Sequence, residues 1–293
     1  MAKKFVNSFK DKLLRYIHKS IYKPGHYYSA VPDPVDIEKR AKQLYRVRNE
    51  IGGVNINETE QLNFLTDATS SIGAFPYFNR ENSFRYKLPN NFFGMGDTLA
   101  LYIIFKSIIP KQVIEIGSGY SSAAMLDYND LFFKSEIKFD FIEPYPERLN
   151  SLLTGKDKGM AMVHTKFVQD VPLDFFRKLN ENDVLFIDSS HVSKIGSDVN
   201  YLFFEVLPIL KKGVVIHIHD IAFPFEYSKD WIDYGIYWNE AYLLRAFLSY
   251  NSSFEILLWN DFLKDKKNAE ITAINPLYSR LGGGSIWLRK MVD

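Results

Sequence analysis

The sequence contains no cysteine, which excludes disulfide bonds, thiolate nucleophiles and cysteine-ligated zinc sites. It has no run of about 18 apolar residues, so we expect no membrane-spanning segment, and its N-terminus lacks the apolar core of a signal peptide. A net charge of +1 gives no reason to expect nucleic acid as a partner. We therefore expect a cytoplasmic protein whose 293 residues form one large domain, or one domain with an appendage.

Positive charge is concentrated in residues 1–24, which contain seven lysine and arginine residues and a single acidic residue, Asp11. Apolar residues such as Phe5, Phe9 and Leu13 recur at four-residue spacing, which predicts a basic amphipathic helix. Such a helix either packs on its own domain or contacts an anionic membrane surface or a partner. The sequence leaves these alternatives open.

Strand and helix patterns alternate from residue 112 onward, which indicates a parallel sheet with helices on both faces. We predict strands over 112–116, 138–143, 163–168, 183–187, 213–219, 254–259 and 284–289. We predict helices over 36–50, 59–70, 97–109 (with Asp97 as N-cap), 121–128, 146–153, 173–179, 194–210 and 239–250. The last two strands are joined without a clear crossover helix, so we expect an antiparallel return. The predicted fold is α/β, with a helical N-terminal extension over 1–85 and a seven-stranded Rossmann-like core over 86–293.

The most informative stretch is a strand, a tight glycine turn and a helix start within residues 112–126. The turn reads Gly117-Ser118-Gly119 and is followed by Tyr120, Ser121 and Ser122. A turn of this kind brings backbone N–H groups close to a ligand at the carboxyl edge of a parallel sheet. We expect all six residues to contact a cofactor.

Charge at the turn distinguishes the cofactor classes that use it. The turn has no Gly-Lys-Ser/Thr sequence, which excludes a triphosphate loop, and Ser122 replaces the third glycine of a dinucleotide turn. Glu115 precedes the turn, and no lysine or arginine follows between Gly117 and Leu126 to balance a pyrophosphate. A carboxylate is favourable beside the sulfonium and ammonium groups of S-adenosylmethionine. This cofactor therefore fits best.

Two further acids follow the next strands. Glu143 ends the second strand, where a carboxylate can accept hydrogen bonds from both ribose hydroxyls, although a nicotinamide dinucleotide site would place an acid there too. Asp170 follows the third strand and either binds the adenine amino group or caps the next helix.

Glu-Ile-Gly-Ser-Gly at 115–119, followed by Glu143 and Asp170 on successive strands, resembles the class I S-adenosylmethionine-dependent methyltransferases. The resemblance covers about residues 86–290. Stretches 94–97, 115–122, 188–191 and 219–220 resemble small-molecule O-methyltransferases, many of which act in polysaccharide or natural-product biosynthesis. The resemblance implies cofactor roles for Glu115, Gly117, Gly119, Glu143 and Asp170. It also implies a small-molecule or saccharide acceptor.

The fourth and fifth strands end in Asp188-Ser189-Ser190-His191 and His219-Asp220, which adjacent strands should bring to one crevice beside the cofactor turn. Methyl transfer to oxygen requires a hydroxyl that loses its proton. His191 is the candidate base because an unperturbed histidine has a pKa of about 6.5. Asp188 would orient His191 or hold the substrate and would border the cofactor, and His219 would line the site.

Catechol-type O-methyltransferases resemble this chain at both strand ends and use Mg²⁺. The resemblance assigns Asp188 and Asp220 as metal ligands, but the expected third ligand, an asparagine, is replaced by Ile221. Where that family has a basic lysine, this chain has His191. The sequence thus leaves the need for Mg²⁺ open.

Two other functions compete with methyl transfer. His217 and His219 point to the same side of the fifth strand and, with a carboxylate, could serve a metal-dependent oxygenase or hydrolase. The chain could also be a catalytically silent cofactor-binding scaffold. The aromatic segment 223–240 follows the fifth strand and is either the roof of an acceptor pocket or a small satellite core.

Overall fold

The computed structural model describes residues 13, 16–17, 20–78, 84–157 and 159–293. The chain divides into two compact units, one of residues 1–48 with 226–237 and one of residues 49–225 with 238–293. Most of the basic helix predicted over 1–24 lies outside the described residues, so that prediction stays untested. No helix in the described part of the chain is both long and apolar enough to cross a membrane.

The smaller unit contains helices α2 (Pro34–Leu44) and α8 (Lys229–Asp233). The carboxylate of Asp33 accepts a hydrogen bond from the N–H of Val35 and so caps the start of α2. Lys229 pairs with Glu38 of α2 at 3.3 Å and with Asp233 of α8 at 2.8 Å. The pair with Glu38 connects the segment 226–237 with the N-terminal residues, although the two lie far apart in the sequence.

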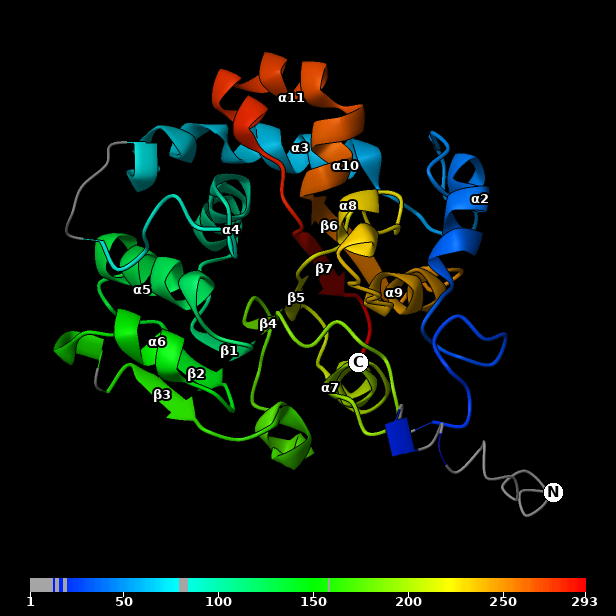
Figure 1. Cartoon of the computed structure of the whole chain (residues 1–293). Helices are drawn as coiled ribbons and strands as arrows, with labels where there is room; N and C mark the ends of the chain where they lie inside the picture. The colour runs from blue at the N-terminus through cyan, green and yellow to red at the C-terminus, as the bar shows by residue number, and fades with distance from the viewer. Residues whose placement is uncertain (1–12, 14–15, 18–19, 79–83, 158) are drawn as a thin grey trace. The chain divides into compact units, whose positions relative to one another are not determined.

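The larger unit is built on a seven-stranded sheet with the strand order β3-β2-β1-β4-β5-β7-β6 (Figure 1). The first five strands are parallel, and β7 runs antiparallel between β5 and β6. The strands are β1 (Gln112–Ile116), β2 (Lys138–Ile142), β3 (Ala161–His164), β4 (Val184–Ile187), β5 (Val215–Ile218), β6 (Phe254–Trp259) and β7 (Ile286–Lys290). This confirms the predicted Rossmann-like sheet and its antiparallel return.

Helices surround the sheet (Figure 1). Helix α4 packs on α5, and α5 packs on α6. All residues of β4 and β5 are buried, as expected for central parallel strands. The α-helices are α3 (Glu58–Ala68), α4 (Met95–Ile108), α5 (Tyr120–Phe132), α6 (Glu147–Leu152), α7 (Asp198–Tyr201), α9 (Glu240–Leu248), α10 (Asn260–Lys266) and α11 (Asn268–Ile274). The shorter helical turns are η2 (Thr69–Ala74), η3 (Pro76–Phe78), η4 (Gly155–Asp157), η5 (Val168–Asp170), η6 (Leu173–Phe175), η7 (Leu202–Val206), η8 (Leu207–Ile209) and η9 (Pro276–Arg280).

The boundary between the compact units lies at Arg48/Asn49, whereas the sequence placed a boundary at residue 85. Long-range hydrogen bonds explain the difference, because they fasten α3 to the sheet unit. The side chain of Gln61 accepts a hydrogen bond from the backbone N–H of Trp259 at 2.8 Å. The hydroxyl of Tyr278 donates to the backbone carbonyl of Leu65 at 2.7 Å.

Three local predictions are corrected. Helix α4 starts after Gly94 rather than Asp97, and the buried carboxylate of Asp97 accepts hydrogen bonds from Gly94 N and from the backbone and hydroxyl of Ser285. The segment between β6 and β7 contains the two short helices α10 and α11, where the sequence showed no clear helix. The predicted helix over 173–179 is reduced to the turn η6.

Candidate active site

The hydrogen-bond ladder of the sheet continues one residue beyond the strand ends and thereby places the site residues. Asp188 N donates to Ile116 O at 2.9 Å, and His219 N donates to Ile187 O at 2.9 Å. Glu143 N likewise donates to a carbonyl at the end of β3. The carboxyl ends of β1, β2, β4 and β5 therefore bring these three side chains to one edge, as predicted from the strand pattern.

The glycine turn has the predicted position after β1, but Glu115 has a different role from the one expected. Glu115 is fully buried, and its two carboxylate oxygens accept hydrogen bonds of 2.5 Å from the hydroxyls of Ser121 and Ser122. Burial raises the pKa of Glu115 to about 8 against the opposing effect of these hydroxyls. Glu115, Ser121 and Ser122 thus fix the turn to the start of α5.

Because of this raised pKa, Glu115 should make stability depend on pH. The stability contributed by neutral Glu115 is fully present below about pH 4.5 and is lost as pH rises through about 8. The slope in this range should approach about 1.4 kcal/mol per pH unit. Urea unfolding between pH 5 and 9 should show this loss in wild type but not in Glu115→Gln, with exposed Glu147→Gln as control. Parallel curves for wild type and Glu115→Gln would contradict the assignment.

A cavity of about 400 Å³ opens at the ends of β1, β2 and β4. Of the predicted cofactor residues, Gly117, Glu143 and Asp188 line this cavity. One carboxylate oxygen of Glu143 accepts a hydrogen bond from Ser118 N at 3.1 Å, so the turn and this acid support each other. The remaining residues of the turn are not among those that line the cavity, and their contact with a cofactor stays a prediction.

Gln169, rather than Asp170, lines the cavity, whereas Asp170 is exposed. Both belong to the short turn η5, so the register of this turn decides which side chain reaches the cavity. Among the described residues, the buried Oε1 of Gln169 and Oγ of Ser189 have no hydrogen-bond partner. Buried polar atoms of this kind normally have partners, so the cavity suits a polar ligand.

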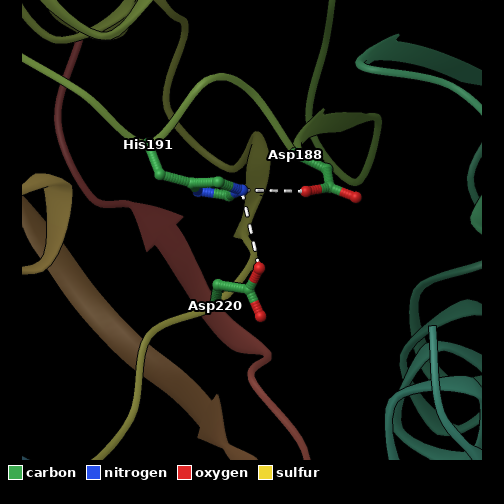
Figure 2. A group of neighbouring side chains, drawn as sticks. All are labelled: Asp188, His191 and Asp220. Atoms are coloured by element: carbon green, nitrogen blue, oxygen red, sulfur yellow. Dashed lines mark ion pairs between the residues drawn. The ribbon is translucent and has the colours of Figure 1, made fainter. Parts of the chain in front are cut away.

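Asp188, His191 and Asp220 form a cluster beside this cavity (Figure 2). The Nε2 of His191 lies 3.3 Å from Asp188 Oδ1 and 3.5 Å from Asp220 Oδ2. The side chain of His191 is only 6% exposed, whereas those of Asp188 and Asp220 are 27% and 22% exposed. The two carboxylates are therefore the parts of the cluster that a substrate can reach.

Helix α9 holds His191 in place. The carbonyl of His191 accepts hydrogen bonds from the backbone N–H groups of Asn239 and Glu240 at the start of this helix. The Nδ1 of His191 lies 2.9 Å from Oε2 of Glu240, whose side chain is fully buried. His191 and Asp220 both have left-handed backbones, with φ of 59° and 56°. Such strain persists only where the surrounding structure imposes it, and it is concentrated at functional sites.

The surroundings of His191 change its protonation from the sequence-based expectation. Burial alone would lower its pKa, but the hydrogen bonds with Asp188 and Glu240 raise the pKa to about 10. At neutral pH, the ring in the metal-free protein is therefore a positively charged imidazolium, protonated on both nitrogens. The expectation of a free base with a pKa near 6.5 is wrong for this form, because the sequence did not reveal the buried carboxylate of Glu240.

His217 and His219, the two histidines of the alternative metal site, each contact a different partner. His217 is fully buried, its Nε2 lies 3.0 Å from Ser285 Oγ, and burial lowers its pKa so that the ring is neutral. His219 is also buried, and its Nε2 donates to the carbonyl of Phe92 at 3.2 Å. Among the described residues, the side chains with the spacing of a metal site are Asp188, His191 and Asp220. The structure thus does not assemble the oxygenase or hydrolase site around His217.

The aromatic segment 223–240 is divided between the two compact units, because residues 226–237 belong to the smaller one. Trp238 belongs to the sheet unit, and its ring centroid lies 4.3 Å from that of His191. An aromatic neighbour of the cluster was therefore predictable from the sequence, whereas the roles of Glu240 and Gln169 were not. The only signal for Glu240 was its place at the start of a predicted helix.

Comparison with known proteins relates this site to a family. Residues 114–221, from β1 to just beyond Asp220, match the sequence model of a methyltransferase domain. An uncharacterized protein of Archaeoglobus fulgidus is 34% identical over 169 residues, which make up 55% of this chain and 75% of that protein.

Solved structures with a similar chain path include the O-methyltransferase TomG of Streptomyces achromogenes, in complex with SAM. It is 13% identical, with a TM-score of 0.43 over 89% of this chain and 97% of its own. The SAH-bound methyltransferase PaMTH1 of Podospora anserina is also 13% identical, with a TM-score of 0.44 over 89% of this chain and 98% of its own.

Proposed function

We propose that this chain, which belongs to the class I S-adenosylmethionine-dependent methyltransferases, methylates a hydroxyl oxygen of a small molecule or saccharide. The observation that carries the proposal is the position of Asp188, which lines the cavity and also belongs to the carboxylate–histidine cluster. Asp188 therefore puts the proposed cofactor cavity directly beside the side chains that can act on an acceptor.

The residues of the cavity fit S-adenosylmethionine. Glu143 offers carboxylate oxygens to ribose hydroxyls, and the unpartnered atoms of Gln169 and Ser189 can bond the polar edge of adenine. The cofactor supplies an electrophilic methyl group on a positively charged sulfur, and the negative charge of Asp188 is favourable beside it. This supports the assignment of the cavity to the cofactor.

The cluster supports oxygen rather than nitrogen as the methylated atom. A hydroxyl attacks well only when its proton is removed, whereas a neutral amine already has an available lone pair. The acceptor oxygen forms the new bond to the methyl carbon, the S–CH₃ bond breaks, and its electron pair stays on sulfur. The hydroxyl proton passes to a carboxylate oxygen of Asp188 or Asp220, the exposed acids of the cluster.

Methyl transfer to oxygen can be tested with S-adenosylmethionine labelled with ¹³C in its methyl group. The protein is incubated with a panel of phenols, sugars and amines, and the ¹³C chemical shift of each product distinguishes O-methyl from N-methyl groups. We expect O-methyl products that disappear with Asp188→Ala. Transfer to amines alone would overturn the assignment of the acceptor atom while retaining the family.

Replacing Glu143 should weaken cofactor binding because two ribose hydrogen bonds to a carboxylate are lost. We expect Glu143→Ala to reduce S-adenosylmethionine affinity by about 1–3 kcal/mol, or roughly 5- to 150-fold, in calorimetric titration. Glu147→Ala, on the exposed face of the following helix, is the matched control and should bind as wild type does. Equal affinities for both variants would remove Glu143 from the cofactor site.

A further inference from the structure

A stretch near the N-terminus combines positive charge with exposed apolar side chains. Residues 12–32 contain four lysine and arginine residues and no aspartate or glutamate. Six large apolar or aromatic side chains of this stretch are exposed, namely Leu13, Tyr16, Ile17, Tyr27, Tyr28 and Val31. We propose that these six side chains, here called the N-terminal surface, dock on a lipid bilayer that has anionic headgroups. The proposal does not depend on methyl transfer.

The first part of the N-terminal surface is one face of a helix. Leu13, Tyr16 and Ile17 have helical backbone conformation. They are spaced three and four residues apart, so their side chains lie on the same face. Their exposed fractions are 46%, 86% and 60%. An apolar face that is turned to solvent in this way favours docking on a partner over packing on its own domain.

The second part is a compact loop over residues 25–31, which precedes α2 (Figure 1). The backbone N–H of Gly25 donates to the carbonyl of Val31 at 3.0 Å and closes the loop. Tyr27 and Tyr28 lie in the middle of the loop, where their ring centroids are 4.9 Å apart in an edge contact. These side chains are 89% and 67% exposed. The loop thus presents two tyrosine rings in a preformed arrangement, which lowers the entropy lost on docking.

The chemistry of the N-terminal surface matches the boundary between headgroups and acyl chains. A tyrosine ring is apolar and its hydroxyl is polar, so the side chain is favourable where a bilayer changes from hydrocarbon to water. Leu13, Ile17 and Val31 are wholly apolar and gain free energy when they leave water for this boundary. The lysine and arginine residues of 12–32 attract anionic headgroups, and no acidic residue within the stretch opposes them.

Other occupants match this surface less well. A second copy of the chain would bring the same positive charge to the contact, and like charges repel. A nucleic acid would neutralise the charge, but its phosphates and sugars are polar and leave the aliphatic side chains in a wet interface. A bilayer satisfies the charge and the apolar side chains together.

The experiment is co-sedimentation of the full, untagged chain with vesicles of mixed phosphatidylcholine and phosphatidylglycerol, and with pure phosphatidylcholine vesicles in parallel. We expect at least about 10-fold tighter binding to the anionic vesicles, and weaker binding as salt screens the charges. The double substitution Tyr27→Ser and Tyr28→Ser should weaken binding at least about 10-fold, because two rings are removed from the bilayer. Lys23→Gln should weaken it about 5-fold, the equivalent of about 1 kcal/mol for one basic residue.

The matched controls come from the larger unit. Tyr250 is 94% exposed, and Tyr250→Ser tests whether any exposed tyrosine supports binding. Lys212 is exposed too, and Lys212→Gln tests whether any loss of positive charge weakens it. Both controls should bind anionic vesicles as wild type does. All these substitutions affect exposed side chains, so we expect wild-type midpoints in urea unfolding.

Three results would overturn the proposal: no binding of folded wild type to anionic vesicles, equal binding to both kinds of vesicle, or equal losses for Tyr250→Ser and the double variant. Binding to a single-stranded oligonucleotide without vesicle binding would assign the surface to nucleic acid instead. A dimer that the double variant abolishes, again without vesicle binding, would assign it to a second copy.

The vesicle experiment contains neither S-adenosylmethionine nor an acceptor, so its result is separate from that of the proposed function. Methyl transfer without vesicle binding would leave the methyltransferase assignment intact and remove the docking surface. Vesicle binding with the expected losses would support the docking surface even if no hydroxyl were methylated.

Discussion

Replacing Gly117 with alanine should strongly weaken cofactor binding, because the turn leaves no room for a side chain. The backbone of Gly117 is left-handed, with φ of 78°, and a Cβ there would lie 1.7 Å from the carbonyl oxygen of Asp188. Left-handed strain and overpacking together should cost roughly 2–5 kcal/mol. The carbonyl would have to move by more than 1 Å to reach ordinary contact, since real Cβ atoms stay beyond 3.0 Å.

This movement should disturb two sites at once, because Asp188 both lines the cavity and belongs to the cluster. We expect S-adenosylmethionine affinity to fall at least about 100-fold in calorimetry, which corresponds to about 2.7 kcal/mol. Gly155→Ala is the matched control, since a Cβ at Gly155 meets no atom within 4 Å. Wild-type affinity in folded Gly117→Ala would show that the close approach does not position Asp188.

The sheet was predictable because its signals are local. The strands 112–116 and 254–259 have the predicted bounds, since largely apolar runs there are bordered by turns or polar residues. The antiparallel end was also predicted, because the connection between the last two strands showed no clear crossover helix. By contrast, α10 and α11 have seven residues each, too few for a clear helical period in the sequence.

Of the site residues, only those that directly follow a strand could be placed from the sequence. Asp188, His219 and Asp220 follow β4 and β5 directly, so the parallel sheet alone brings them together. Glu240 comes from a helix 49 residues beyond His191, and only the packing of that helix puts its carboxylate beside the imidazole. The raised pKa of His191 depends on this contact, so a residue's ordinary pKa gave the wrong protonation state.

Arg85 is another residue whose role depends on its contacts and not on its residue type alone. Its guanidinium belongs to a buried ion network. It bonds Asp127 at 3.0 Å, Asp130 at 2.8 Å and Asp157 at 2.6 Å. The side chains of Arg85, Asp127 and Asp157 are only 7%, 3% and 3% exposed. The network joins the segment before α4 to α5 and to the turn at Asp157.

Arg85→Met should therefore destabilise the protein by about 3–5 kcal/mol at pH 7, because buried carboxylates lose their counter-charge. Burial would raise the pKa of Asp157, but hydrogen bonds from Arg85 and Thr154 lower it below 3.8. This contribution to wild-type stability is present above about pH 3.8 and is lost as pH falls through the lowered value. The difference between wild type and variant in urea unfolding should thus shrink in acid.

Arg177→Met, which removes an exposed pair with Asp174, should cost less than about 1 kcal/mol. Equal losses for the two variants would show that the buried network contributes no more than a surface ion pair.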